Sequence, residues 1–209
     1  MQINILDNTF TLHQLGAAYW HERQMLLVAD VHFGKIAHFR KYGSALPKKA
    51  IIRNFERLNE LLQLFKPKKT CFLGDLFHSA FNIEWFYFEN WVKQQTCQFS
   101  LIVGNHDIIS PLRFEAIGFL LYEELIIDRF LLTHHPEERK NYFNFCGHIH
   151  PGVKLAGQAR QILKLPCFLK KPNQLIFPAF GEFTGNFIVQ PEDDNQVFVI
   201  TPEEVVLIE

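Results

Sequence analysis

Residues 25–32 read MLLVADVH, five apolar residues followed at once by Asp30, Val31 and His32. An unbroken apolar run of this length is typical of a β-strand that is buried on both faces, as strands of parallel sheets are. In an extended backbone, residues two apart lie on one face, so we expect Asp30 and His32 to point to the same side. The stretch predicts a buried strand with two candidate metal ligands at its end.

Two further predicted strands end in the same way. The strand over residues 70–73 runs into Gly74-Asp75, and the strand over residues 99–103 runs into Gly104-Asn105-His106-Asp107. An amphipathic helix is predicted over residues 47–65 and an aromatic-rich helix over residues 83–95, which gives the alternation βαβαβ of an α/β fold. Ligands bind open α/β sheets beyond the carboxyl ends of the strands, so these polar residues mark a candidate site.

The second half of the chain is predicted to be mainly β. Short apolar segments separated by Pro, Gly and Asn lie near residues 119–122, 125–133, 142–146, 152–155, 163–169, 174–177 and 197–200. Two of these segments are followed by histidines, in Thr133-His134-His135-Pro136 and in Gly147-His148-Ile149-His150. We expect two packed sheets with helices outside them, in one domain that spans residues 1–209.

Composition narrows the class of protein. The 209 residues are 48% hydrophobic and 21% charged, which excludes disordered and low-complexity chains. The 22 Phe are expected mainly in the core. The net charge of −1 gives no overall attraction to nucleic acid or anionic membrane, so a polyanion site would have to be local. The four cysteines are spread singly, and we expect them to be reduced and mostly buried. No secretory signal or membrane-spanning run of about 18 apolar residues is present in the sequence given, so we expect a cytoplasmic protein without a membrane partner.

The candidate ligands form a set of oxygen and imidazole donors without thiolate, which suits Mn²⁺, Fe or Zn²⁺. Their number exceeds the needs of one ion. It suffices for two divalent ions about 3.5–4 Å apart that share a carboxylate, the arrangement that clamps both oxygens of a phosphoryl displacement. Asp75 is the natural bridge.

The ordered motifs D-x-H, G-D, G-N-H-[DE], H and G-H-x-H resemble those of the calcineurin-like metallophosphoesterases. That resemblance implies a four-layer αββα sandwich of two mixed sheets flanked by helices, and a metal-bridging hydroxide as nucleophile. It also implies that Asn105 stabilises the added charge, and that His106, oriented by Asp107, protonates the leaving oxygen. The implied ligands are Asp30, His32, Asp75 and His150 for the first ion, and Asp75, Asn105, His134 and His148 for the second.

A narrower resemblance, to the bacterial DNA-ligase-associated metallophosphoesterase subgroup, rests on residues 32–35 (HFGK), 146–151 (CGHIHP) and 178–181 (PAFG). It implies a DNA phosphodiesterase or endonuclease in DNA repair, with DNA and ligase-associated repair proteins as partners and Mn²⁺ as the expected metal. The alternatives are a small-molecule phosphoesterase for nucleotides, cyclic nucleotides or a phospholipid precursor, and a non-catalytic scaffold that binds a partner through the aromatic helix. The oligomeric state stays open, a dimer included.

Several single residues have two interpretations. The ligand after residue 132 is His134 or its neighbour His135, with His134 favoured. Lys35 either begins a helix or binds a substrate phosphate as a point charge. His78 is expected to pack rather than line the site. The stripe Trp85, Phe86, Phe88 and Trp91 is expected in the helix core. The other histidines outside the motifs (His13, His21, His38) are expected to be surface or packing residues, and the basic residues Arg40, Lys41, Lys48, Lys49 and Arg53 to be solvated, although a phosphate backbone could run past those near Lys35.

Overall fold

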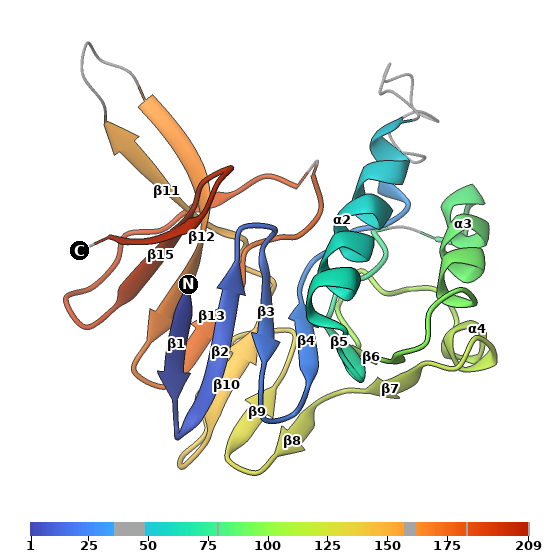
Figure 1. The fold of residues 1–209 in the computed structure, drawn as a ribbon, viewed down its shortest axis with the longest axis horizontal. Coiled ribbons are helices and arrows are strands. Elements are labelled where there is room, and N and C mark those ends of the chain that lie inside the picture. Colours follow the sequence, from blue (N-terminus) through green and yellow to red (C-terminus); the bar gives the residue numbers. More distant parts are fainter. Residues whose placement is uncertain (36–48, 79, 157–161, 183, 209) are drawn as a thin grey trace.

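The computed structural model describes residues 1–35, 49–78, 80–156, 162–182 and 184–208, without the side chains of residues 49 and 50. These residues form two β-sheets that pack against each other, and helices cover the outer face of the first sheet (Figure 1). The predicted α/β fold of two mixed sheets is confirmed, and the helices of the described residues lie on the first sheet.

The first sheet has seven strands in the spatial order of the sequence. The pairs from β1 to β4 are antiparallel, and the pairs from β4 to β7 are parallel. The strands are β1 (Gln2–Ile5), β2 (Asn8–His13), β3 (Ala17–Trp20), β4 (Met25–Val28), β5 (Lys69–Leu73), β6 (Gln98–Ile102) and β7 (Leu120–Tyr122). Because β4, β5 and β6 are parallel, the residues that follow them meet at one edge of the sheet.

The helices are α2 (Lys49–Phe65), α3 (Ile83–Val92) and α4 (Pro111–Ala116). The three helices pack against the first sheet through one apolar cluster. Leu58 of α2, Phe88 of α3 and Phe114 of α4 are buried in it together with residues of the strands. The predicted start of α2 at Pro47 lies outside the described residues, and α3 ends three residues earlier than predicted. Helix α4 was not predicted, because six residues with one buried side chain give no helical periodicity.

The second sheet runs in the spatial order β14-β11-β12-β13-β10-β9-β8; in addition, β15 pairs with β12, and β16 pairs with β15. Its strands are β8 (Leu125–Ile127), β9 (Phe130–Leu132), β10 (Phe143–Cys146), β11 (Pro151–Ala156), β12 (Ile162–Lys171), β13 (Gln174–Ile176), β14 (Phe187–Ile188), β15 (Gln196–Ile200) and β16 (Val205–Ile208). β9 is parallel to β10, so their carboxyl ends also lie together. Among the described residues no helix contributes to this sheet's apolar clusters.

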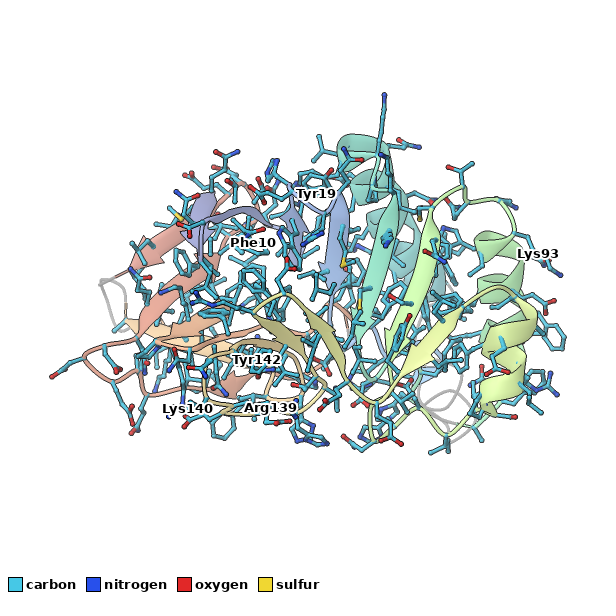
Figure 2. All side chains as sticks on the ribbon, turned by 90° about the horizontal axis from the view of Figure 1, so that it is seen from below. Phe10, Tyr19, Lys93, Arg139, Lys140 and Tyr142 are labelled. Carbon is cyan, nitrogen blue, oxygen red and sulfur yellow. The ribbon has the colours of Figure 1, made fainter. Side chains whose placement is uncertain are left out.

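Aromatic side chains fill the layer between the sheets. Phe10 and Trp20 of the first sheet contact Phe130 and Phe145 of the second, with ring centroids 4.6–6.3 Å apart; Figure 2 shows Phe10 in this layer. Most Phe are buried, as predicted. In α3 the prediction holds for Trp85, Phe88 and Trp91, but Phe86 is 49% exposed because it lies on the outer side of the helix.

The predicted single strand over residues 125–133 is wrong. The chain reverses at Asp128, which has a φ of 54°, and forms the hairpin of β8 and β9. The sequence hides this turn, because no glycine or proline interrupts the apolar pattern. The two short strands β14 and β16 were also missed. All four cysteines are unpaired, with Cys97 partly buried and the others buried. No helix among the described residues is long and apolar enough to cross a membrane.

Candidate metal centre

The candidate ligands gather where strands of both sheets end. Asp30 and His32 follow β4, Asp75 follows β5, and Asn105 follows β6. From the second sheet, His134 follows β9, and His148 and His150 follow β10. Backbone bonds join these ends: the amide of Asp30 donates to the carbonyl of Gly74, and the amide of Gly147 donates to the carbonyl of His134. The site therefore lies at one end of the sandwich.

The backbone at these residues is not extended. Asp30, His32, Asp75, His148 and His150 all have a φ between 49° and 68°, in the left-handed region that non-glycine residues seldom occupy. We predicted that Asp30 and His32 point to the same side because their backbone is extended. That reason was wrong, since β4 ends at Val28, before both residues. Such conformations persist only where the surroundings enforce them, and they are concentrated at functional sites.

Asp30, His32 and His150 form the first donor group. Nε2 of His150 lies 3.2 Å from Oδ1 of Asp30 and 3.4 Å from Nε2 of His32. Oδ2 of Asp30 accepts from the amide of His148, whereas Oδ1 is buried without a hydrogen bond among the described residues. A buried carboxylate oxygen that faces imidazole nitrogens is a position that a divalent cation would satisfy.

His134 is at the centre of the second donor group. Its Nδ1 lies 3.0 Å from the carbonyl oxygen of Leu73, which can only accept, so Nδ1 carries the hydrogen and Nε2 has the lone pair in the neutral ring. This Nε2 lies 3.0 Å from Oδ1 of Asn105 and 3.4 Å from Oδ1 of Asp75, and neither oxygen has a hydrogen to offer. Nδ1 of His148 is 3.2 Å away. Four nitrogen and oxygen atoms of the kind that bind metals lie this close together and fit a cation between them.

Asp75 faces both groups. Its Oδ1 is directed to His134, while its Oδ2 lies 4.0 Å from Nε2 of His32. The carboxylate is 3% exposed, and Oδ1 also accepts from the amide of His106 at 2.9 Å. One carboxylate with an oxygen toward each donor group has the geometry of a bridge between two ions.

The environment keeps imidazoles of the site neutral. Burial, with the neighbouring His150 as the next cause, lowers the pKa of His32 to about 2. Burial, followed by the proximity of His135 and His134, also lowers the pKa of His148. Neutral imidazole is the form that binds metals, so both rings are ready to act as ligands at neutral pH.

Glycines leave room for this packing. Gly74 has a φ of 84°, and a Cβ built on it would overlap the His134 ring. A Cβ on Gly104 would overlap the carboxylate and the amide nitrogen of Asp75. Glycine is therefore needed at position 74 for its left-handed φ, whereas at position 104 it is needed for the close approach of Asp75.

Asp107 lies differently from the prediction. Its Oδ1 accepts from the amide of Phe77 at 2.9 Å, and its Oδ2 accepts from the amide of Gly104 at 2.9 Å. Burial raises the pKa of this carboxyl to about 7. Among the described interactions none joins Asp107 to the ring of His106, so the carboxyl holds the loop that carries Asn105 and His106 instead of orienting the imidazole directly.

His106 lies at the rim of the donor groups beside a residue that sequence reasoning assigned to packing. Its ring centroid is 5.7 Å from that of His32, and it stacks on the ring of His78 at 4.8 Å. His78 also contacts the ring of His32 at 5.2 Å. The signal for His78 was its position three residues beyond Asp75, in the same loop.

Lys35 lies in the turn after His32, half-buried, and burial lowers the pKa of its amine. Of the other basic residues, Arg53 is exposed and paired with Glu182 at 2.6 Å. Arg40, Lys41 and Lys48 lie outside the described residues, as does His38, and the side chain of Lys49 is not described. His13 and His21 lie in the β1–β4 region and bond to Leu15 and Thr11, as packing residues do.

The segment of residues 178–181 supports the first donor group from behind. The amide of Phe180 donates to the carbonyl of Ala29 at 2.9 Å, and the amide of Gly181 donates to the carbonyl of Asp30 at 3.0 Å. Arg57 of α2 donates to the carbonyl of Phe180 and lies over its ring, 4.3 Å from the centroid. This segment therefore fixes the backbone from which Asp30 projects.

A comparison with family models matches residues 24–198 to the calcineurin-like phosphoesterase model. Among solved structures, a Pseudomonas putida nuclease, MPE, is 28% identical over 96% of this chain and 96% of that chain, with a TM-score of 0.83. An Aquifex aeolicus protein of unknown function, AQ665, is 21% identical over 60% of this chain and 78% of its own, with a TM-score of 0.45. The phosphoesterase Yfce from E. coli is 15% identical over 88% and 97%, also with a TM-score of 0.45. No curated protein matches the chain.

Proposed function

The chain belongs to the calcineurin-like phosphoesterase family, and from that premise we propose that it is a dinuclear metal-dependent phosphodiesterase that cleaves DNA. Membership of this family shows that the protein is a metal-dependent phosphoesterase. The dinuclear site, the diester and the DNA are the proposal.

The observation that carries the dinuclear site is the position of Asp75 between two donor groups. Asp30, His32 and His150 with one oxygen of Asp75 would hold the first ion. Asn105, His134 and His148 with the other oxygen would hold the second. Two bound divalent ions would neutralise charge on the phosphoryl group and lower the pKa of a water molecule between them.

The chain's own groups supply the remaining steps. The amide group of Asn105 is fixed at the end of β6 and can donate to a phosphoryl oxygen while its Oδ1 faces His134. His106 stands at the rim with its backbone amide held by Asp75, and its imidazole can protonate the leaving oxygen. Asp107 holds the turn that presents both residues. The left-handed backbones at the ligands hold the donors in place before substrate arrives.

DNA as substrate is supported by the likeness to the Pseudomonas putida nuclease along nearly the whole of both chains. The half-buried Lys35 near His32 supplies a cation beside the site. The net charge of −1 disfavours a large polyanion, although two divalent ions would create a local attractive field. A small diester such as a cyclic nucleotide is the second candidate, because the donor groups alone do not select the ester. A scaffold without catalysis is disfavoured because it has no need for two complete donor groups.

Manganese is the proposed metal, since mixed carboxylate, amide and imidazole donors suit it. We also propose that residues 1–209 act as one domain in DNA repair in the cytoplasm, together with ligase-associated partners. The apolar layer between the sheets draws residues from Ile5 to Val205, which supports a single domain. Four unpaired cysteines fit a reducing compartment.

The experiment is hydrolysis with Mn²⁺ of single- and double-stranded DNA, of bis(p-nitrophenyl) phosphate and of the monoester p-nitrophenyl phosphate. We expect cleavage of DNA and of the diester above the monoester, and loss of all activity in Asp75→Asn. Asp128→Asn is the matched control, because Asp128 is an exposed aspartate paired with Arg23. Rapid hydrolysis of small esters without DNA cleavage would favour the second candidate, and an inactive protein that binds no metal would overturn the proposal.

A further inference from the structure

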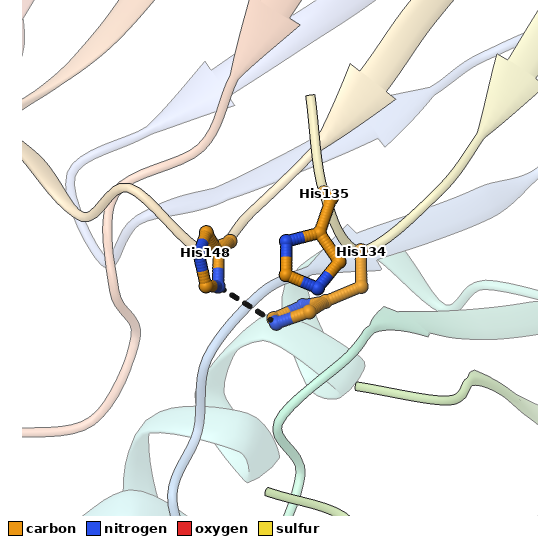
Figure 3. A group of neighbouring side chains, drawn as sticks. All are labelled: His134, His135 and His148. Atoms are coloured by element: carbon orange, nitrogen blue, oxygen red, sulfur yellow. Dashed lines mark hydrogen bonds between the residues drawn. The ribbon is translucent and has the colours of Figure 1, made fainter. Parts of the chain in front are cut away.

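Three histidine rings face one another at the second donor group (Figure 3). His134 and His148 belong to the ligands described above, and His135 is the third. The ring centroid of His135 lies 4.1 Å from that of His148 and 4.8 Å from that of His134. One nitrogen from each ring lies within 4.8 Å of the other two. His134 keeps the central place among the donors, and the position of His135 allows it to bind beside His134.

We propose that His135 is an additional imidazole ligand of the second metal position, so that this position has three imidazoles. The inference rests on the proposed dinuclear function only in assuming that this position holds a metal ion. It assigns to His135 a role that differs from substrate binding and from packing.

The local backbone explains how two consecutive residues can both reach the site. Neighbouring side chains of an extended strand point to opposite faces, but β9 ends at Leu132. Beyond it, Oγ1 of Thr133 donates to the carbonyl of His135 at 2.6 Å and closes a turn. The turn brings both rings to the side on which His148 lies.

A buried polar network holds this turn. Nδ2 of Asn144 donates to Oγ1 of Thr133 at 2.8 Å, and Oδ1 of Asn144 accepts from the amide of Glu137 at 3.0 Å. Asn144 is 1% exposed and Thr133 is 6% exposed. Buried and fully hydrogen-bonded groups of this kind hold one conformation. The backbone of His135 is therefore fixed beside His148, even though the His135 side chain is exposed.

The ring nitrogens are placed so that one metal ion could bind all three. Nδ1 of His134 is occupied by the carbonyl of Leu73, so its Nε2 is left to face Nδ1 of His148 at 3.2 Å. Oδ1 of Asp75 lies 3.4 Å from the same Nε2, so a carboxylate also faces this group. A cation bound by the three nitrogens would use the lone pairs of the neutral rings and would be balanced by the neighbouring carboxylate.

The proposal predicts that the two metal positions differ chemically. The first has two imidazoles and two carboxylates, whereas the second would have three imidazoles with Asn105 and Asp75. More nitrogen ligands favour Zn²⁺ and Co²⁺ over Mn²⁺. We therefore expect the second position to bind Zn²⁺ and Co²⁺ in preference to Mn²⁺.

The experiment compares His135→Ala and His135→Gln with the wild type, each as the full chain freed of metal. Zn²⁺ and Mn²⁺ are titrated by calorimetry with a competing chelator, and Co²⁺ binding is followed by its visible absorption. We expect both variants to keep two sites and to lose at least about tenfold in Zn²⁺ affinity at one of them, since even residues behind a metal ligand change affinity by about 10–100-fold. The Mn²⁺ affinity should fall less, and the Co²⁺ spectrum should change.

His21→Ala is the matched control, because His21 bonds to Thr11 away from the donor groups. Unchanged Zn²⁺ affinity and an unchanged Co²⁺ spectrum in both His135 variants would overturn the proposal. A raised KM for the diester with unchanged metal binding would also overturn it and assign His135 to the substrate. Failure of the wild type to bind two ions would instead overturn the proposed dinuclear function. Equal thermal unfolding of the metal-free proteins checks that the variants fold.

Discussion

Replacing Arg57 by alanine should destabilise the protein through the segment that supports Asp30. Arg57 donates to the carbonyl of Phe180 at 2.6 Å and to the carbonyl of Leu15 at 2.9 Å, and its guanidinium lies over the Phe180 ring. It thereby joins α2 to the loop after β2 and to the segment whose amides bond to Ala29 and Asp30.

The size of the effect follows from these contacts. A hydrogen bond from a charged group contributes about 1.5–3 kcal/mol, and a cation–π contact contributes about 0.5–2 kcal/mol. The contributions are not additive, and water can reach part of the half-buried site after truncation, which offsets some of the loss. We expect Arg57→Ala to lower the free energy of unfolding by about 2–4 kcal/mol. Arg57→Lys should lie between it and the wild type, because one ammonium cannot serve both carbonyls and stack as well.

The assay is urea unfolding of the metal-free protein, followed by titration of metal into the folded variant. Arg53→Ala is the control, one turn earlier on α2, where an exposed arginine pairs with Glu182 and should contribute less than about 1 kcal/mol. We expect Arg57→Ala alone to weaken metal binding, since the support for Asp30 is lost. Equal stability of the two arginine variants would refute the argument that Arg57 clamps this segment.

Three further outcomes are expected. Asp75→Ala should lose both ions by elemental analysis, because the bridge serves both donor groups; two tight ions per chain would contradict the bridging role. His106→Ala should keep its metal content while turnover falls by roughly 10²–10⁴ for alkyl esters and less for p-nitrophenyl esters; an equal fall for both would exclude protonation of the leaving oxygen. In the native protein a thiol reagent should label Cys97 before the other three cysteines, which are buried with raised thiol pKa values; labelling of all four at similar rates, as after denaturation, would contradict their burial.

The sequence predicted the parts of the fold that depend on hydrophobic patterning. The apolar runs before Asp30, Gly74 and Gly104 form three neighbouring parallel strands. The helical spacing of apolar residues distinguished α2 from the strands on either side of it in the sequence. The elements α4 and β14 were not predicted, because each is too short to show a clear hydrophobic pattern. The hairpin at Asp128 was not predicted, because an aspartate with a left-handed backbone has no distinctive sequence pattern around it.

At the site, residue types and order were predictable, but the conformations were not. The left-handed backbones at Asp30 and His32 are held by bonds to Gly74 and Asp75 after β5 and to residues 180–181, which are distant in sequence. The contacts of Asp107 with Phe77 and Gly104, and the stacking of His78 on His106, depend likewise on loops from different strands. Such contacts depend on tertiary packing, so they cannot be predicted from the pattern of one sequence.

The dinuclear site itself is tested most directly by anomalous diffraction from crystals of the protein grown with Mn²⁺. We expect two anomalous peaks about 3.5–4 Å apart, with Asp75 between them. One should lie beside Asp30, His32 and His150, and the other beside Asn105, His134 and His148. A single peak at full occupancy, or two peaks that do not share Asp75, would contradict this arrangement.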